Sequence, residues 1–172
     1  CCTNGKSLRA IETSVMPSSK DFIFIVEKFR KEIPNLTIST DVIVGYPTES
    51  EEDFKQTLKV MEITKPDIIN ISRFWPMPGT KAAQLKTLDH EIVKKRSKEL
   101  MKLHNKISLE KNKSFLGKEL ECLVDEKSFG NFWICRDDSY KNIVVASKEK
   151  LFGKSIKVKI KRATPHSLFG EY

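Results

Sequence analysis

Two charged side chains lie within or near the ends of apolar stretches that predict strands, and such positions can carry a binding or catalytic group. Asp41 lies within the apolar run Leu36–Val44, and Arg73 lies near the end of Asp67–Trp75. A carboxylate inside an apolar strand is costly unless it is paired, so Asp41 needs a ligand, a salt bridge or a backbone hydrogen bond. Arg73 suits a carboxylate or a phosphate, or an ordinary ion pair at the surface. Ligands of α/β proteins bind at such strand ends.

Gly45 follows the first apolar run, where a glycine either lets a flat ligand lie against the backbone or permits the turn. No nucleophile–base pair and no phosphate loop accompanies these residues, and the three histidines share no motif. The four cysteines, at positions 1, 2, 122 and 135, lack the close spacing of zinc or iron–sulfur sites. We therefore expect no metal bound by this chain's own cysteines, and a core role for Cys122.

A third group of candidate residues is basic and lies near the end of the chain. Lys157, Lys159 and Lys161 alternate with apolar residues, so a strand places them on one face about 7 Å apart. That spacing approaches the repeat of a nucleic-acid backbone, whereas the alternative is that lysines keep an outer strand soluble and unpaired. The same segment holds aromatic residues that suit either base stacking or a barrel core: Phe129, Phe132, Trp133 and Tyr140.

An alternation of helices and strands positions the candidates of the first half. Short connections between such elements predict a parallel α/β sheet. In chain order the predicted elements are a helix capped by Ser18 or Ser19 and broken at Pro34-Asn35, a strand Leu36–Val44, a helix with a capping box at Ser50–Asp53 that stops at Lys65-Pro66, and a strand Asp67–Trp75.

The second half changes from a helical period to a period of two. A long helix is predicted from Asp89, its N-cap, to Asn112. Its apolar stripe also contains an arginine and consists of Ile92, Val93, Arg96, Leu100, Leu103 and Ile107. We place a domain boundary near residue 113, which gives domains 1–112 and 113–172. Five short strands punctuated by glycines then predict a small, closed or nearly closed β-barrel: Glu119–Asp125, Asn131–Arg136, Asn142–Ala146, Ser155–Ala163 and Ser167–Glu171.

Composition excludes several classes of protein. The chain has 172 residues, 39% hydrophobic and 31% charged, which excludes disordered and collagen-like chains. No apolar run approaches a membrane span and no signal-peptide pattern is seen, so we expect a cytoplasmic protein without a membrane partner. The net charge of +8 favours a polyanionic partner, and residues 147–162 concentrate it, with seven basic residues against Glu149 alone.

Several stretches resemble one known family. Residues 40–54 read TDVIVGYPTESEEDF, which resembles the signature TDxIVGFPxETEEDF of radical S-adenosylmethionine methylthiotransferases. Residues 76–83 (PMPGTKAA) are similar to the PRPGTPAA loop of that family, and residues 96–100 (RSKEL) resemble its linker helix. Residues 113–172 resemble the TRAM domain, a small RNA-binding barrel. The resemblance is closest to the archaeal and eukaryotic branch, which methylthiolates N6-threonylcarbamoyladenosine at tRNA position 37.

The resemblance implies a fold, cofactors and a partner. The fold is α/β followed by all-β: the later portion of a partial (βα)6 radical-SAM barrel with its linker helix, then a five-stranded, OB-like TRAM barrel. The full-length family uses S-adenosylmethionine and 4Fe-4S clusters, and it acts on tRNA. The strand ends matching the cofactor side are Asp41, Val44, Gly45 and Arg73. The predicted RNA contacts, which position tRNA without selecting a base, are Arg136, Lys141, Asn142, Lys157, Lys159 and Arg162.

The chain also departs from the family pattern. The family's Cys-x3-Cys-x2-Cys cluster motif is missing from the 172 residues, and residues 3–5 read TNG where the family has Gln-Ser-Gly. Since the first residue is Cys1 and not Met, we expect the carboxyl-terminal part of a larger enzyme, inactive without the missing cysteines. One alternative is a stand-alone or remnant RNA-binding protein without catalysis. Another is a related enzyme that modifies a ribosomal protein, against which the PMPGT loop and the basic module argue.

Overall fold

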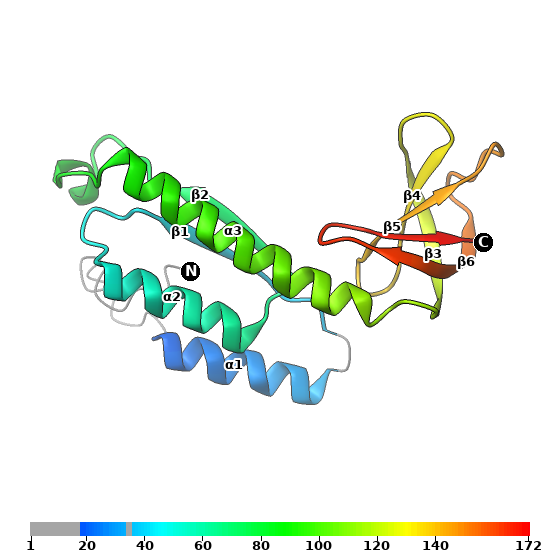
Figure 1. The fold of residues 1–172 in the computed structure, drawn as a ribbon, viewed down its shortest axis with the longest axis horizontal. Coiled ribbons are helices and arrows are strands. Elements are labelled where there is room, and N and C mark those ends of the chain that lie inside the picture. The colour runs from blue at the N-terminus through cyan, green and yellow to red at the C-terminus, as the bar shows by residue number, and fades with distance from the viewer. Residues whose placement is uncertain (1–17, 34–35) are drawn as a thin grey trace. The chain divides into compact units, whose positions relative to one another are not determined.

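The computed structural model describes residues 18–33 and 36–172 (Figure 1). The chain divides within the helix α3 (His90–Lys113) into one unit that ends at His104 and another that begins at Asn105. The predicted domain boundary, near residue 113, lies at the end of the same helix. The expectations for residues 1–5 and for the break at Pro34-Asn35 fall outside the described residues.

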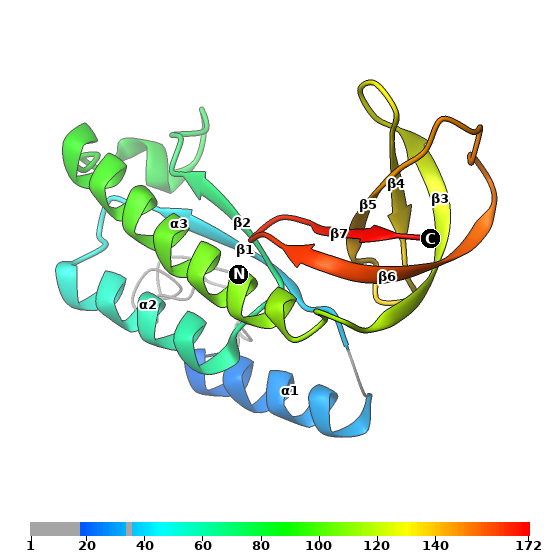
Figure 2. The same ribbon diagram turned by 45° about the vertical axis from the view of Figure 1, so that its right-hand side comes forward.

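The first unit is an α/β arrangement around a short parallel sheet, as predicted. Its elements are α1 (Ser19–Glu32), β1 (Ser39–Val44), α2 (Glu51–Thr64), β2 (Ile68–Arg73), the 3-10 turn η2 (Lys81–Gln84) and the first part of α3. Strands β1 and β2 pair in parallel, with Ser39 opposite Ile68 and Val44 opposite Arg73. Both views show α2 and α3 lying along this sheet (Figures 1 and 2).

Local signals start the helices where the sequence predicts. Ser18 caps α1 and Ser50 caps α2, each within a reciprocal capping box that has an aspartate at position N3 of the helix. The Oδ1 atom of Asp89 accepts the backbone N–H of Glu91 at 2.8 Å, which starts α3 one residue later than the predicted bound. Helix α2 ends at Lys65, which adopts the left-handed conformation before Pro66.

Among the described residues, the core of the first unit lies on one face of the sheet. Val42 and Val44 of β1 pack with buried residues of α2 and α3, among them Phe54, Met61 and Leu100. The opposite face of β1 is exposed, because the strand alternates exposed and buried positions from Ser39 onward. The expectation that Asp41 lies inside an apolar environment is therefore wrong: Asp41 occupies the exposed face. On α3, the expected apolar stripe is buried at Val93 and Leu100, but Ile92 is exposed.

Residues 119–171 form the closed barrel that the period-two pattern predicts. The strands are β3 (Glu119–Lys127), β4 (Phe132–Arg136), β5 (Asn142–Ala146), β6 (Ser155–Ala163) and β7 (Leu168–Glu171). They close in the order β3-β4-β5-β7-β6, and β7 runs parallel to β5 and antiparallel to β6. Register shifts interrupt β3 against β4 and β6 against β7, and such irregularities bend strands into barrels.

Apolar side chains fill this barrel. Its buried cluster includes Trp133, Ile143, Val158 and Leu168, together with Cys122, whose predicted core role is confirmed. Gly170 of β7 lies so close to β6 that an added Cβ would sit 2.6 Å from the carbonyl oxygen of Lys159. In the described part of the chain, no helix has the length and apolar character needed to cross a membrane.

Candidate cofactor face and nucleic-acid interface

The exposed face of β1 and β2 carries polar side chains in register. Asp41 lies opposite Asn70, and Ile43 lies opposite Ser72. The Nδ2 atom of Asn70 donates to Oδ1 of Asp41 at 2.8 Å. A carboxylate held by a carboxamide, with a hydroxyl one register step further on, is a suitable set of partners for the hydroxyl groups of a sugar. The sequence identified Asp41 but missed Asn70 and Ser72, because the pairing depends on strand register.

A pocket of about 610 Å³ lies at the carboxyl end of these strands. Ile43, Ser72 and Arg73 line it from the strands, and Trp75 and Met77 line it from the loop that follows β2. Tyr46 forms another part of the wall and packs edge-to-face on Phe74, with ring centroids 5.3 Å apart. An apolar pocket with a few polar groups at a strand end is the usual form of a small-molecule site. Arg73 thus lines a pocket at the strand end, and its predicted contact with a ligand stays a prediction.

Val44 and Gly45 occupy a different environment from Asp41 and Arg73. Val44 is buried on the helix-covered face, and its carbonyl oxygen accepts the backbone N–H of Phe74 at 2.8 Å. Gly45 has φ of +84°, and a Cβ there would lie 2.6 Å from Cγ2 of Val93. The structure thus gives both residues a packing role in the turn that ends β1. Their predicted contact with a cofactor remains a prediction.

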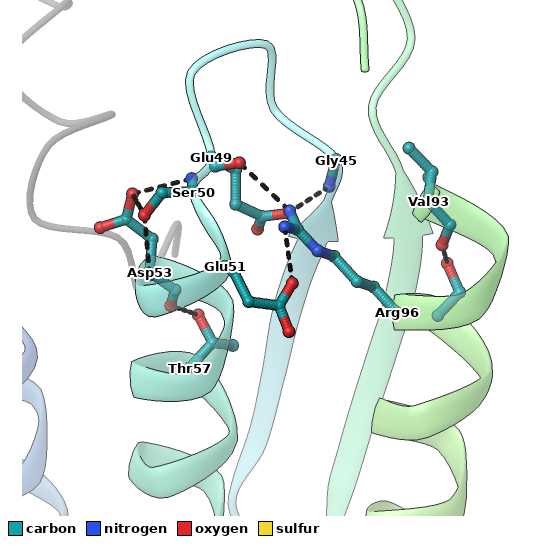
Figure 3. Close-up of polar contacts among 9 residues, drawn as sticks. Gly45, Glu49, Ser50, Glu51, Asp53, Thr57, Val93 and Arg96 are labelled. Carbon is teal, nitrogen blue, oxygen red and sulfur yellow. Dashed lines mark hydrogen bonds and ion pairs between the residues drawn. The ribbon is translucent and has the colours of Figure 1, made fainter. Parts of the chain in front are cut away.

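A buried ion pair fixes the turn that follows β1 (Figure 3). Nη1 of Arg96, on α3, lies 2.7 Å from Oε2 of Glu49 and also donates to the backbone oxygen of Glu49 at 3.2 Å. The same carboxylate oxygen accepts the backbone N–H of Gly45 at 3.0 Å. Nη2 of Arg96 reaches Glu51 at 3.1 Å, and the guanidinium lies 5.3 Å from the ring centroid of Phe54. Arg96 therefore connects α3 directly to the end of the turn and, through the Glu49 carboxylate, to its start at Gly45.

The consequence of this ion pair is a rigid connection beside the pocket. The side chains of Glu49 and Arg96 are only 4% and 7% exposed, so neither charge is solvated by bulk water. The loop they hold includes Tyr46, which lines the pocket. The sequence placed Arg96 on an apolar helix stripe but did not identify Glu49 as its partner. The one available signal was the position itself, since an arginine among buried apolar residues requires a carboxylate.

The predicted lysine row lies on the outer surface of the barrel, but it is not isolated. Lys157 lies opposite Glu121 of β3, and Lys159 lies opposite Glu119. Nζ of Lys161 lies 3.1 Å from Oε2 of Glu171 on β7. Directly opposed residues of antiparallel strands have Cβ atoms about 5 Å apart, so each lysine has an acid beside it. Strand β6 pairs with β3 through Ser155–Lys159 and with β7 through Lys159–Ala163, so the alternative of an unpaired outer strand is wrong, and a role of these lysines in solubility stays a prediction.

The other predicted RNA contacts are distributed over the barrel. Arg136 of β4 and Asn142 of β5 are register partners, whereas Arg162 lies on β6 with its guanidinium 3.7 Å from the ring centroid of Phe169. Asn142 donates to Oγ of Ser167 at 3.0 Å, and Nζ of Lys141 lies 5.5 Å from the ring centroid of Phe115.

Arg136 lies in a pocket with a predominantly acidic lining. Its Nε donates to Oδ2 of Asp125 at 2.8 Å, and its guanidinium lies 4.8 Å from the ring centroid of Tyr140. The pocket, about 650 Å³ in volume, is also lined by Asp137 and Asp138. These carboxylates compete with a phosphate for Arg136, so its predicted contact with RNA stays a prediction.

The two described cysteines are core residues in their chemistry as well as their position. Burial raises the pKa of the Cys122 thiol to about 12, with the nearby Cys135 a further cause, and burial raises the pKa of Cys135 to about 11. Metal ligation requires the thiolate, which these environments disfavour. Within residues 18–33 and 36–172, no group of three His, Cys, Asp or Glu side chains is arranged to hold a metal ion.

The sequence of this chain is similar to those of known proteins. Residues 113–172 match the family model described as TRAM domain. The chain is 40% identical over 152 residues to a probable threonylcarbamoyladenosine tRNA methylthiotransferase of Archaeoglobus fulgidus, covering 88% of this chain and 35% of that protein. It is 34% identical over 152 residues to the threonylcarbamoyladenosine tRNA methylthiotransferase of Xenopus laevis, covering 88% and 27%.

A further relative is named for a different modified nucleoside. A tRNA-2-methylthio-N(6)-dimethylallyladenosine synthase of Petrotoga mobilis is 36% identical over 171 residues, covering 98% of this chain and 38% of that protein. The β3–β7 barrel is thus a TRAM domain, joined to part of an α/β domain. Over 88% or more of its length the chain matches proteins named as enzymes of tRNA methylthiolation, as its motifs indicated, and residues 113–172 match the TRAM domain. It spans about a third of the length of these curated relatives.

Proposed function

We propose that this chain serves a tRNA methylthiotransferase by binding tRNA and by forming one wall of the S-adenosylmethionine site. The reaction is the conversion of N6-threonylcarbamoyladenosine at tRNA position 37 to its 2-methylthio derivative. One observation carries the proposal. The same chain holds a TRAM barrel and the strand end of residues 40–54 that resembles the family signature, and its relatives are named tRNA methylthiotransferases. The threonylcarbamoyl substrate follows the names of the archaeal and eukaryotic relatives, and the dimethylallyl substrate is the competing choice.

The exposed sheet face fits the nucleoside part of the cofactor. Asp41, held by Asn70, suits a ribose diol, and the apolar pocket wall beside Ile43 suits an adenine ring. Arg73 suits the methionyl carboxylate. When bound, the cofactor supplies the methyl group and the radical chemistry. These residues bind and orient it, and the Glu49–Arg96 ion pair positions the turn that carries Tyr46.

The iron–sulfur clusters of the full-length family are not assigned to these residues. The described thiols, Cys122 and Cys135, lie in the barrel core with raised pKa values. Buried thiols with raised pKa values do not suit an iron–sulfur cluster, whose ligands are thiolates. An RNA-binding protein without catalysis is the second candidate function, and the closed barrel with its own core supports it. The coding sequence upstream of Cys1 separates the two: an in-frame Cys-x3-Cys-x2-Cys supports the enzyme, and a start codon contradicts it.

Binding of tRNA tests the proposal directly. Fluorescence anisotropy of the full 172-residue chain with an unmodified tRNA transcript is expected to show an affinity that falls steeply between about 50 and about 200 mM salt, because phosphate contacts release counterions. The variant with Lys157, Lys159 and Arg162 changed to Ala is expected to lower the salt slope by about 0.9 for each lost contact. An unchanged slope removes those three residues from the interface. No binding of tRNA at low salt contradicts the proposed function.

A further inference from the structure

Two loops meet at one end of the barrel. Residues 128–131 connect β3 to β4 and residues 147–154 connect β5 to β6, and both views show these yellow and orange loops at the same end (Figures 1 and 2). The backbone N–H of Ser147 donates to the carbonyl oxygen of Asn131 at 2.7 Å, which joins the loops. Nε1 of Trp133 donates to the carbonyl oxygen of Ser147 at 3.3 Å, so a buried indole supports the junction.

Each loop presents a phenylalanine to solvent from a well-defined turn. Phe129 is 94% exposed, and its turn is closed by hydrogen bonds between Ser128 and Phe132 and between Phe132 and Phe129. Phe152 is 61% exposed, and the preceding residue, Leu151, is buried in the barrel core. Large aromatic side chains exposed on ordered turns gain nothing for the fold, because their area is not removed from water. They are therefore available to a partner.

Lysines lie beside Phe152 with little acidic compensation. A hollow of about 480 Å³ is lined by Lys127, Lys148 and Lys150, with Glu149 as its one acidic lining residue. Trp133 and Phe152 complete the lining, and Nζ of Lys127 lies 4.2 Å from the ring centroid of Trp133. This differs from the lysine row of β6, where each lysine has a glutamate beside it.

We propose that this end of the barrel is a binding site for single-stranded RNA. Its residues, here called the loop patch, are Lys127, Phe129, Lys148, Lys150 and Phe152. Bases stack on the two phenylalanines and the lysines contact the phosphates between them, which is the chemistry of sequence-tolerant single-strand binding. A duplex keeps its bases stacked in pairs, so it cannot present them in this way. The proposal rests on the proposed function only in that the ligand is RNA.

Alanine at both tips tests the stacking. A fluorescein-labelled oligoadenylate, single-stranded or in duplex with its complement, is titrated with the full chain by anisotropy. Changing Phe129→Ala and Phe152→Ala together is expected to weaken single-strand binding by at least about 10-fold, since each stacked base contributes about 5- to 150-fold. Tryptophan at both positions is expected to restore it. The matched control is Phe24→Ala, which removes an aromatic side chain that is 63% exposed on α1 of the first unit.

Paired lysine variants test the charge. Lys148→Ala with Lys150→Ala is expected to lower the salt slope for oligoadenylate by about 0.7 per lysine. Lys157→Ala with Lys159→Ala removes the same charge from the row beside Glu119 and Glu121 and is expected to change the slope less. An equal effect of the two pairs overturns the placement of the site. Thermal melting by circular dichroism verifies that all variants fold.

The outcomes separate this proposal from the proposed function. If tRNA and oligoadenylate both bind and the alanine variants bind equally well, the loop patch is overturned and tRNA binding stands. If the duplex binds as tightly as the single strand, stacking is overturned. If neither RNA binds, both proposals fail. If the chain instead binds phosphatidylserine vesicles through Phe129 and Phe152 and does not bind oligoadenylate, the patch is a membrane surface and the RNA site is overturned.

Discussion

The two units of the chain solve the problem of burying a sheet in different ways. The β1–β2 sheet covers one face with α2 and α3 and leaves the other exposed, with Ile43 and Ile68 each 42% exposed. The barrel has no edge, and its strands bury only apolar side chains and cysteines. Buried charge occurs in the first unit, where Glu49, Asp53 and Arg96 are all less than 9% exposed.

This difference suits the first unit to the chemistry of ligand binding and the barrel to folding independently. A sheet with an open face and a buried ion pair depends on specific partners, because a buried charge that loses its partner destabilises the fold. A closed barrel with an apolar core depends on packing alone and can present its loops to a large ligand without rearrangement. We therefore expect perturbations of the two units to have separate effects.

The largest expected effect is the loss of the buried ion pair. Arg96→Met leaves the Glu49 carboxylate with the Gly45 N–H but without a cation, and we expect a cost of about 3–5 kcal/mol in the first unit. Hydrogen exchange with mass spectrometry measures each unit separately, and peptides of residues 119–171 are expected to stay protected. Lys94→Met, which removes an exposed pair with Glu91, is the control and is expected to cost about 0.5 kcal/mol or less.

A cavity in the barrel is expected to destabilise the barrel and leave the first unit unchanged. Ile143 is fully buried, so Ile143→Ala is expected to cost about 3 kcal/mol through lost transfer energy and an unfilled cavity. Deprotection is expected in peptides of β3–β7, with the β1–β2 peptides unchanged. Ile63→Ala removes an isoleucine that is 47% exposed on α2 and serves as the matched control. Loss of protection in both units together would mean that they unfold as one.

Two glycines in left-handed conformations sharpen the comparison further. Gly45→Ala is expected to cost about 2 kcal/mol, because the new methyl group meets Val93 in addition to the backbone strain. Gly153→Ala in the barrel is expected to cost about 1 kcal/mol, because no described heavy atom lies within 4 Å of the added Cβ. Val93→Ala in the Gly45→Ala background is expected to recover part of the cost. Strict additivity in this double-mutant cycle would contradict the crowding.

The smallest effect is expected from ionisation of the thiols of Cys122 and Cys135, which leaves stability at neutral pH unchanged. The raised pKa values of Cys122 and Cys135 favour the protonated thiol in the fold, so their contribution is present below pH 9 and is lost as pH rises through about 11 and 12. At pH 8, alkylation of both should be slow and should accelerate only when the barrel opens. Peptide mapping should find this rate unchanged by Arg96→Met and increased by Ile143→Ala.

Much of the fold follows from local sequence signals. The predicted cap at Ser18 or Ser19, the capping box at Ser50, the alternation in β6 and the glycine-punctuated strands are local patterns, and the structure confirms the elements they predict. The family resemblance identified the class from contiguous motifs in the same way. Exposure of Asp41 was missed, because an apolar run does not tell which faces of its strand are covered.

The site depends on long-range pairing, which local patterns do not encode. The glutamates beside Lys157 and Lys159 come from β3, more than thirty residues earlier, and only the strand register reveals them. The partners Glu49 and Arg96 are separated by 47 positions. The two loops that carry the loop patch are likewise joined by a long-range contact, the hydrogen bond from the Ser147 N–H to the carbonyl oxygen of Asn131. The charge pattern of the sequence therefore identified the basic module. It could not distinguish the lysines of the loop patch from those of β6 that lie beside glutamates.

The position of β7 has a consequence for the order in which the barrel folds. Strand β7 lies between β5 and β6 and pairs in parallel with β5, so Ile143 meets Leu168 only when the last strand is present. A nascent chain that has reached β6 still has two unpaired strand edges, which are sites of aggregation. Closure is thus the final step of synthesis for this module, and its long-range contacts favour slow folding. Ribosome-bound chains halted before Leu168 should be captured by chaperones that bind exposed strands.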